Sequence, residues 1–322
     1  QEMLFDEAAP FIKFALGENV KQSNWGDYQR QRFPQTRMGV EQVFYDHFVR
    51  AKEYGEAWEK YNASMANLTR KQKRKKEFPV APRVDLELQT LWEILQKERF
   101  ISCHSYRQDE INMLMHVADS MGFTLNTFTH ILEGYKLADK MAEHGAGGST
   151  FSDWWAYKFE VKDAIPYNGA IMWEQGVVTA YNSDDAEMAR RLNQEAAKAH
   201  KYGDVPQEEA LKFVTLNPAK LLHIDHLVGS LKVGKHADLV IWSDNPLSIY
   251  AKAEQTFVDG KRFWDVNRDL EKRKEIAKDR ARIIQLMLDE NAGKGKKGKG
   301  GKKPSAPQKL HYHCDTILKD EI

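Results

Sequence analysis

Two histidines end consecutive apolar runs of the sequence, and this placement favours metal chemistry. His104 closes the run FISCH at residues 100–104, and His130 closes the run FTLNTFTH at residues 123–130. Apolar residues at helical spacing lie between the runs, so the segment reads as strand, helix, strand. The carboxyl ends of parallel strands face one pocket, and neutral imidazole is a common metal ligand. We expect a shared metal site, although either histidine alone would more often be a structural residue.

Lys13 and Asp184 are the further candidates for this site. Lys13 interrupts the apolar run at residues 9–16, where a buried lysine needs a partner or a neutral form. It could carry a carbamate that bridges two metal ions, or it could point to solvent from an edge strand. Asp184 ends the apolar run at residues 176–185, where a carboxylate can bind metal and take a proton from water. The alternative is that Ser183 or Asp184 caps the next helix.

The composition is that of a folded protein whose net charge is close to zero. The 322 residues are 42% hydrophobic, enough for one large domain and an appendage. Lys+Arg 48 against Asp+Glu 47 favours neither nucleic acid nor an anionic membrane as partner. Cys103 and Cys314 make no disulfide framework, and no apolar run is long enough to cross a bilayer. The chain starts at Gln1 in what reads as the middle of an α/β domain, so the compartment is left unassigned.

The remaining segments alternate between helical and irregular patterns. Periodicity predicts helices at 39–61, 85–96 and 186–203, and a helix at 269–288 whose apolar stripe docks on the body. The basic stretch at 70–83 reads as a surface loop, and an irregular, aromatic-rich segment at 145–169 could wall an active site. Two short helices split at Asn217-Pro218 are expected within 206–222, followed by β-strands joined by Gly turns within 228–265 that form a small sheet outside the main domain.

Residues 211–247, LKFVTLNPAKLLHIDHLVGSLKVGKHADLVIWSDNPL, resemble a known signature, "T-x-NPA…GSL-x-x-GK-x-ADLV". It is typical of the amidohydrolase superfamily, in the branch of imidazolonepropionase-related and prolidase-like hydrolases. The stretches CHSYRQDEI, THILEGYKLAD and YNSDDAEMARRLNQEAA support the match, which spans roughly residues 11–265. The resemblance implies an α/β fold, a (β/α)₈ TIM barrel with a metal centre at its carboxyl-terminal mouth, joined to a small β-sandwich.

The resemblance also implies roles for the four candidates. His104 and His130 resemble the metal ligands on the fifth and sixth barrel strands. Asp184 resembles the eighth-strand aspartate that binds metal and shuttles the proton, and Lys13 resembles the fourth-strand lysine that some members carbamylate. The implied cofactor is a divalent metal, zinc, as one or two ions.

Tyr106 and Arg107 lie where prolidase-like members hold a substrate carboxylate.

A departure from the family concerns its first strand, whose H-x-H pair should precede Lys13 by well over a hundred residues. Twelve residues precede Lys13 here, and none is a histidine. The tail pair His311 and His313 has this spacing but follows the sandwich segment.

We therefore expect a fragment, or a chain completed by another polypeptide. The predicted domains are an incomplete barrel with strands four to eight at 1–222, part of the β-sandwich at 223–266, a C-terminal helix at 267–291, and a disordered Lys/Gly-rich tail at 292–322.

The expected function is metal-dependent hydrolysis of an amide or peptide-like C–N bond with Asp184 as general base. The alternatives are a deaminase of a cyclic amidine, a non-catalytic scaffold or incomplete fragment without the H-x-H metal site, and polyanion binding through the basic run at 70–76 and the tail. Expected partners are a small-molecule or dipeptide-like substrate, the missing part of the barrel and a second copy of the chain, with no nucleic acid and no membrane.

Overall fold

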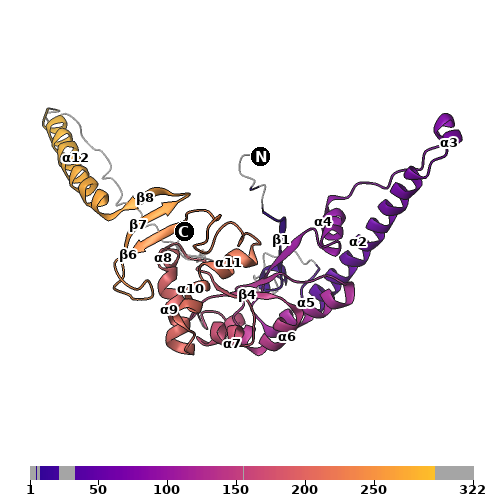
Figure 1. Ribbon diagram of the computed structural model, residues 1–322, viewed down its shortest axis with the longest axis horizontal. Helices are drawn as coiled ribbons and strands as arrows, with labels where there is room; N and C mark the ends of the chain where they lie inside the picture. The colour runs from indigo at the N-terminus through magenta and orange to yellow at the C-terminus, as the bar shows by residue number, and fades with distance from the viewer. Residues whose placement is uncertain (1–4, 6–7, 22–32, 155, 294–322) are drawn as a thin grey trace, which may run out of the picture. The chain divides into compact units, whose positions relative to one another are not determined.

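Five short runs of apolar and small residues form one parallel sheet (Figure 1). The strands are β1 (Phe11–Ala15), β2 (Phe100–His104), β3 (Thr127–Thr129), β4 (Gly147–Thr150) and β5 (Thr179–Tyr181). They pair in chain order, and the register aligns Ala15 with His104, His104 with Thr129, and Thr129 with Ser149. The carboxyl ends of neighbouring strands therefore lie at one edge of the sheet.

The computed structural model describes residues 5, 8–21, 33–154 and 156–293. The chain groups into two compact units, residues 1–183 with 189–235, and residues 184–188 with 236–322. The first unit holds the parallel sheet. Its helices are α1 (Glu18–Lys21), α2 (Arg37–Ala66), α3 (Arg70–Lys75), α4 (Leu86–Leu95), α5 (Gln108–Met121), η1 (Gly134–Lys136), α6 (Ala138–His144), η2 (Phe159–Val161), α7 (Asn168–Glu174), α9 (Leu192–Gly203), α10 (Gln207–Lys212) and α11 (Leu216–Leu221).

One face of the sheet packs into the main hydrophobic core. Alternate strand residues such as Phe14, Cys103 and Phe128 are buried there, and Phe48 of α2 and Leu114 of α5 pack in the same cluster. Helix α2 contacts both α4 and α5, while its far end and α3 extend away from the sheet (Figure 1). Removal of this much aromatic and aliphatic surface from water is the main force that holds the first unit together.

A buried ion pair fixes the end of β1 to α5. The Lys21 ammonium lies 2.7 Å from Glu110 Oε1 and donates to the Leu16 carbonyl at 3.0 Å. Arg37 Nε lies 2.9 Å from the same carboxylate. Burial raises the pKa of Glu110, and both cations oppose that rise. These contacts connect the first strand, α1 and α2 to the start of the helix that follows His104.

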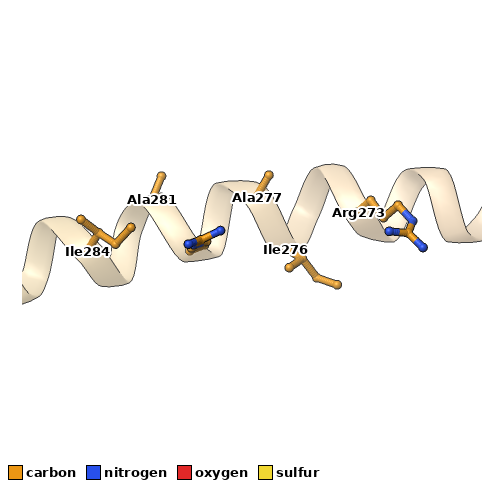
Figure 2. A pocket seen from close by; sticks show the side chains of 6 residues that line it. Arg273, Ile276, Ala277, Ala281 and Ile284 are labelled. Carbon is orange, nitrogen blue, oxygen red and sulfur yellow. The ribbon is translucent and has the colours of Figure 1, made fainter. Parts of the chain in front are cut away.

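The second unit contains three antiparallel strands and a long helix. Its elements are α8 (Ala186–Ala189), β6 (Leu239–Trp242), β7 (Ala253–Val258), β8 (Lys261–Asp265) and α12 (Val266–Gly293). The strands pair in the order β6-β7-β8, and α12 contacts β7 and β8. Apolar side chains of α12, including Ile276, Ala277, Ala281 and Ile284, line a shallow depression along the helix (Figure 2). Ile276 is 64% exposed within this unit as described, and the docking of the stripe on the body stays a prediction.

Three predictions of local structure are wrong. Residues 70–75 form α3 instead of a loop, because Thr69 accepts a hydrogen bond from the Gln72 N–H and Gln72 Oε1 accepts one from the Thr69 N–H. The segment expected to be irregular contains β4, η2 and the first two residues of α7. The two short helices expected within 206–222 are present as α10 and α11, but the break between them is not at Asn217-Pro218: Pro218 lies in the first turn of α11, where the missing proline N–H costs no intrahelical bond.

The parallel α/β arrangement agrees with the predicted fold class, while closure into a full barrel, the incomplete strand count and the sandwich remain predictions. The predicted domain boundaries likewise remain predictions. His311, His313 and Cys314 lie outside the described residues, as does the tail from residue 294 onward. Within the described part, no helix has the length and apolar character needed to span a bilayer.

Candidate functional site

Backbone hydrogen bonds hold the carboxyl ends of the first three strands in register beyond the strands themselves. The Leu16 N–H donates to the His104 carbonyl at 3.0 Å, and the Ser105 N–H donates to the Thr129 carbonyl at 3.0 Å. The Ile131 N–H continues the pattern to the Ser149 carbonyl at 3.2 Å. His104 is the last residue of β2, and His130 follows β3 directly, so both imidazoles are carried by backbone that neighbouring strands fix.

The two predicted histidines come together as a pair. His104 Nδ1 lies 3.0 Å from His130 Nδ1, with ring centroids 4.6 Å apart and planes inclined by 58°. In this contact one Nδ1–H donates to the other Nδ1, so the accepting nitrogen carries no proton. Burial, followed by the charges of His130, Lys13 and Lys158, lowers the pKa of His104 to about 3. The His104 imidazole is therefore neutral across the physiological pH range.

His130 adopts a backbone conformation that side-chain-bearing residues rarely use. Its φ is 60°, in the left-handed region. This conformation turns the chain at the end of β3 and places the imidazole next to His104. Backbone strain of this kind is held by the surrounding structure and often occurs at functional sites.

The spacing of the imidazole nitrogens fits a shared divalent metal. Zinc–nitrogen bonds of about 2.0–2.1 Å in tetrahedral geometry place two ligand nitrogens about 3.3 Å apart. The observed 3.0 Å between His104 Nδ1 and His130 Nδ1 is close to that value. Across the described residues, no group of three or more His, Cys, Asp or Glu side chains is placed to hold one ion. Metal binding by the pair therefore stays a prediction that needs further ligands.

Lys13 and Asp184 remain predicted members of that set. Lys13 lies on β1 with its side chain exposed, and its Cα pairs with Ser102, two residues before His104. Its charge contributes to the lowered pKa of His104. Asp184 follows β5 with a φ of 50° and belongs to the second unit. The Met188 N–H donates to Asp185 Oδ1 at 2.8 Å, so Asp185 caps α8.

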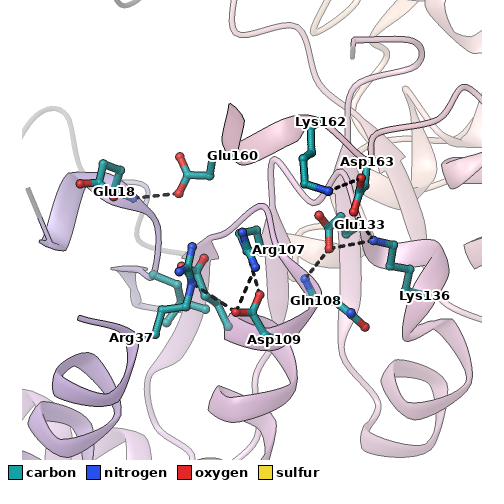
Figure 3. Close-up of polar contacts among 12 residues, drawn as sticks. Glu18, Arg37, Arg107, Gln108, Asp109, Glu133, Lys136, Glu160, Lys162 and Asp163 are labelled. Carbon is teal, nitrogen blue, oxygen red and sulfur yellow. Dashed lines mark hydrogen bonds and ion pairs between the residues drawn. The ribbon is translucent and has the colours of Figure 1, made fainter. Parts of the chain in front are cut away.

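Tyr106 and Arg107 have different surroundings. The Tyr106 ring is buried and meets the His104 ring edge to face, with centroids 4.8 Å apart. The Tyr106 hydroxyl accepts a hydrogen bond from the Lys158 ammonium at 3.1 Å. Arg107 Nε donates to Asp109 Oδ1 at 2.9 Å (Figure 3). The Arg107 guanidinium is thus already paired with a carboxylate of the same chain. The role of Tyr106 and Arg107 in substrate binding stays a prediction.

Several residues near the histidines carried no signal in the sequence. Glu133 is buried, accepts a hydrogen bond from the Gln108 N–H at 3.0 Å and pairs with Lys136 (Figure 3). It thereby stabilises the first turn of α5, directly after the His104 strand. The segment expected to wall the site does contribute Phe151, whose ring lies 5.4 Å from that of His130. Its buried aromatic character was the only available signal.

Comparison with known proteins finds similarity to amidohydrolases. A sequence profile of the Amidohydrolase family matches residues 163–263. The amidohydrolase tasK of Hapsidospora irregularis is 27% identical over 266 residues, covering 81% of this chain and 26% of that protein. The urease subunit alpha of Laribacter hongkongensis (strain HLHK9) is 32% identical over 116 residues, covering 31% of this chain and 20% of that protein. The chain thus spans about a quarter or less of the length of these relatives.

A solved structure supports the same assignment. The amidohydrolase from Thermotoga maritima MSB8 superposes with a TM-score of 0.67 at 29% identity, covering 81% of this chain and 64% of that chain. This likeness extends over most of the present chain, and the profile match includes the signature stretch. These matches support the amidohydrolase superfamily for this chain.

Proposed function

We propose that this chain contributes to the active site of a metal-dependent hydrolase that cleaves an amide or peptide-like C–N bond. The observation that carries the proposal is the 3.0 Å separation between His104 Nδ1 and His130 Nδ1 at the ends of adjacent parallel strands. Two imidazole nitrogens this close together are suited to a divalent cation, zinc above all. The similarity to amidohydrolases supports hydrolysis as the reaction class.

His104 and His130 would hold the metal, with Asp184 and carbamylated Lys13 as the proposed further ligands. A bound divalent ion supplies Lewis acidity, which polarises the scissile carbonyl and acidifies the attacking water. Asp184 would accept the proton that this water loses and deliver it to the leaving nitrogen as the C–N bond breaks. The imidazoles are fixed by the strand ends, so little rearrangement is needed when the ligand set assembles.

Zinc binding and zinc-dependent turnover test this proposal together. The chain is dialysed against chelator, freed of chelator, and titrated with zinc by calorimetry, alongside His104→Asn and His130→Asn. The matched control is His116→Asn, whose exposed ring lies on α5. We expect zinc to bind the wild-type chain and the control, and either histidine variant to lose at least about tenfold in affinity.

Hydrolysis is measured on a panel of N-acyl amino acids and dipeptides before chelation, after it and after zinc is restored. Activity that follows the metal supports the proposal. Activity that is unchanged through both steps, or a wild-type chain that binds no zinc, refutes it. Ammonia release from cyclic amidines with no amide cleavage would identify a deaminase instead.

A further inference from the structure

Lys158 places a positive charge beside the histidine pair that the proposed chemistry does not use. Its ammonium donates to the Tyr106 hydroxyl at 3.1 Å and lies 4.2 Å from the centroid of the Tyr106 ring. The Tyr106 ring in turn packs edge to face on His104, 4.8 Å between centroids. One aromatic ring therefore separates the cation from the imidazoles. The effect of Lys158 on the pKa of His104 agrees with this proximity.

The charge on Lys158 is weakly neutralised compared with its neighbours. Glu160 Oε2 lies 3.8 Å from the Lys158 ammonium, beyond hydrogen-bond distance, and Glu160 Oε1 accepts a bond from the Glu18 N–H at 2.9 Å. By contrast, Lys162 lies 2.7 Å from Asp163 (Figure 3). In the described part of the chain, the hydrogen-bond partner found for Lys158 is a neutral phenol, which orients the ammonium without cancelling its charge.

The Lys158 side chain can be reached from solvent, and its neighbours restrict its conformations. Its side chain is 37% exposed, so the ammonium can be reached from solvent, whereas the Tyr106 beneath it is 4% exposed. The Tyr157 ring is a second aromatic neighbour, with its centroid 5.5 Å from the ammonium. Contact with two aromatic faces limits the rotamers of a long side chain, so a ligand bond costs less entropy there than at a free surface lysine.

We propose that the Lys158 ammonium is the anion subsite of this active site and binds a carboxylate group of the substrate. This inference rests on the proposed function and specifies its substrate class as amides that carry a free carboxylate. A lysine ammonium offers three donors and a full charge, of which Tyr106 uses one donor. Tyr106 is a positioning residue that orients the Lys158 ammonium through the hydrogen bond to its hydroxyl. Arg107, the cation expected from the sequence, is already paired with Asp109.

Calorimetry with a matched pair of probes tests the subsite. The probes are N-acetyl-L-alanine and N-acetyl-L-alaninamide, which share the amide bond and differ in the carboxylate. Metal-free chain is used, since a bound ion would itself attract the carboxylate. The variants are Lys158→Gln, Lys158→Arg and Tyr106→Phe, with Lys162→Gln as the control because Lys162 lies four residues away and pairs with Asp163.

We expect the wild-type chain to prefer the carboxylate probe, and Lys158→Gln to weaken its binding about 10- to 100-fold while leaving the carboxamide unchanged. Lys158→Arg should recover part of the preference, and Tyr106→Phe should reduce it without abolishing it. Lys162→Gln should behave as wild type. Equal binding of the two probes by the wild-type chain, no measurable binding of the carboxylate, or an equal effect of Lys162→Gln would overturn the proposal.

The two proposals can fail separately. Lys158-dependent preference for the carboxylate in a chain that hydrolyses neither probe after zinc is added would retain the subsite and reject the hydrolase. Zinc-dependent hydrolysis of both probes with equal KM values would retain the hydrolase and reject the subsite.

Discussion

Replacing His104 with asparagine should remove a stability loss that the wild-type chain undergoes on mild acidification. Burial, followed by the charges of His130, Lys13 and Lys158, lowers the pKa of His104 from 6.5 to about 3. Between these values the unfolded chain binds a proton that the folded chain does not. A fall in pH below 6.5 therefore favours unfolding, and the loss stops growing near pH 3.

The size of this effect follows from the shift in pKa. Each pH unit within the window costs the folded state about 1.4 kcal/mol, so acidification from about pH 7.5 to pH 5 costs at most about 2 kcal/mol. The His104 ring is only partly buried, and water that reaches it reduces the cost to about 1–2 kcal/mol.

Urea unfolding of metal-free chain, followed by circular dichroism at several pH values, measures the difference. The wild-type chain should lose about 1–2 kcal/mol more than His104→Asn between about pH 7.5 and pH 5. His116→Asn, which changes an exposed ring on α5, should keep the wild-type slope. Parallel pH dependence of wild type and His104→Asn would refute the reasoning, as would loss of the slope in the control.

Zinc should raise the urea midpoint of the wild-type chain by the equivalent of about 2.7 kcal/mol at a hundredfold excess over its Kd, and chelation should reverse the gain. His130→Asn should abolish this stabilisation, and equal stabilisation of both chains would contradict a histidine site. Gly55→Ala should destabilise by about 1–3 kcal/mol in the same assay, because a Cβ at Gly55 overlaps the Trp92 indole, and Trp92→Leu should relieve the loss in the double variant. A stable Gly55→Ala chain would show that α2 and α4 can separate. Two lysines lower the pKa of Asp163 to about 2, so its contribution to stability is present above the unfolded pKa near 4 and disappears as the pH falls toward 2. Stability curves of wild type and Asp163→Asn should therefore converge in acid, and a constant gap would contradict the ion pairs.

Much of the parallel fold was predictable from local apolar periodicity. The strand ending in His104, the helix ending before Gly122 and the long helix α2 all follow from that signal. Strand β4 was not predictable, because the sequence Gly-Gly-Ser-Thr has low strand propensity. The structure supplies the reason for its glycines: a Cβ at Gly148 would lie 3.0 Å from the Met172 sulfur.

The site was predictable only where chain position determines side-chain position. His104 and His130 end adjacent parallel strands, and the alignment of strand ends brings their rings together. Lys158 reaches the same neighbourhood from a segment without apolar periodicity, so its place beside Tyr106 depends on the path of a loop. The spacing of residues in the sequence does not predict the path of such a loop. The pairing of Arg107 with Asp109 was likewise invisible, although the two lie two residues apart.

The alternation of side chains along the strands determines which face of the sheet can carry chemistry. Phe14, Cys103 and Phe128 point into the core, so the residues between them point to the opposite face. That opposite face carries Lys13 and His104, which are respectively exposed and partly buried. An apolar layer packed over it would bury a lysine and an imidazole pair without new partners, at a cost of several kcal/mol. Whatever covers this face must therefore be polar, solvent-filled or a ligand, an environment that the proposed site at the strand ends would need.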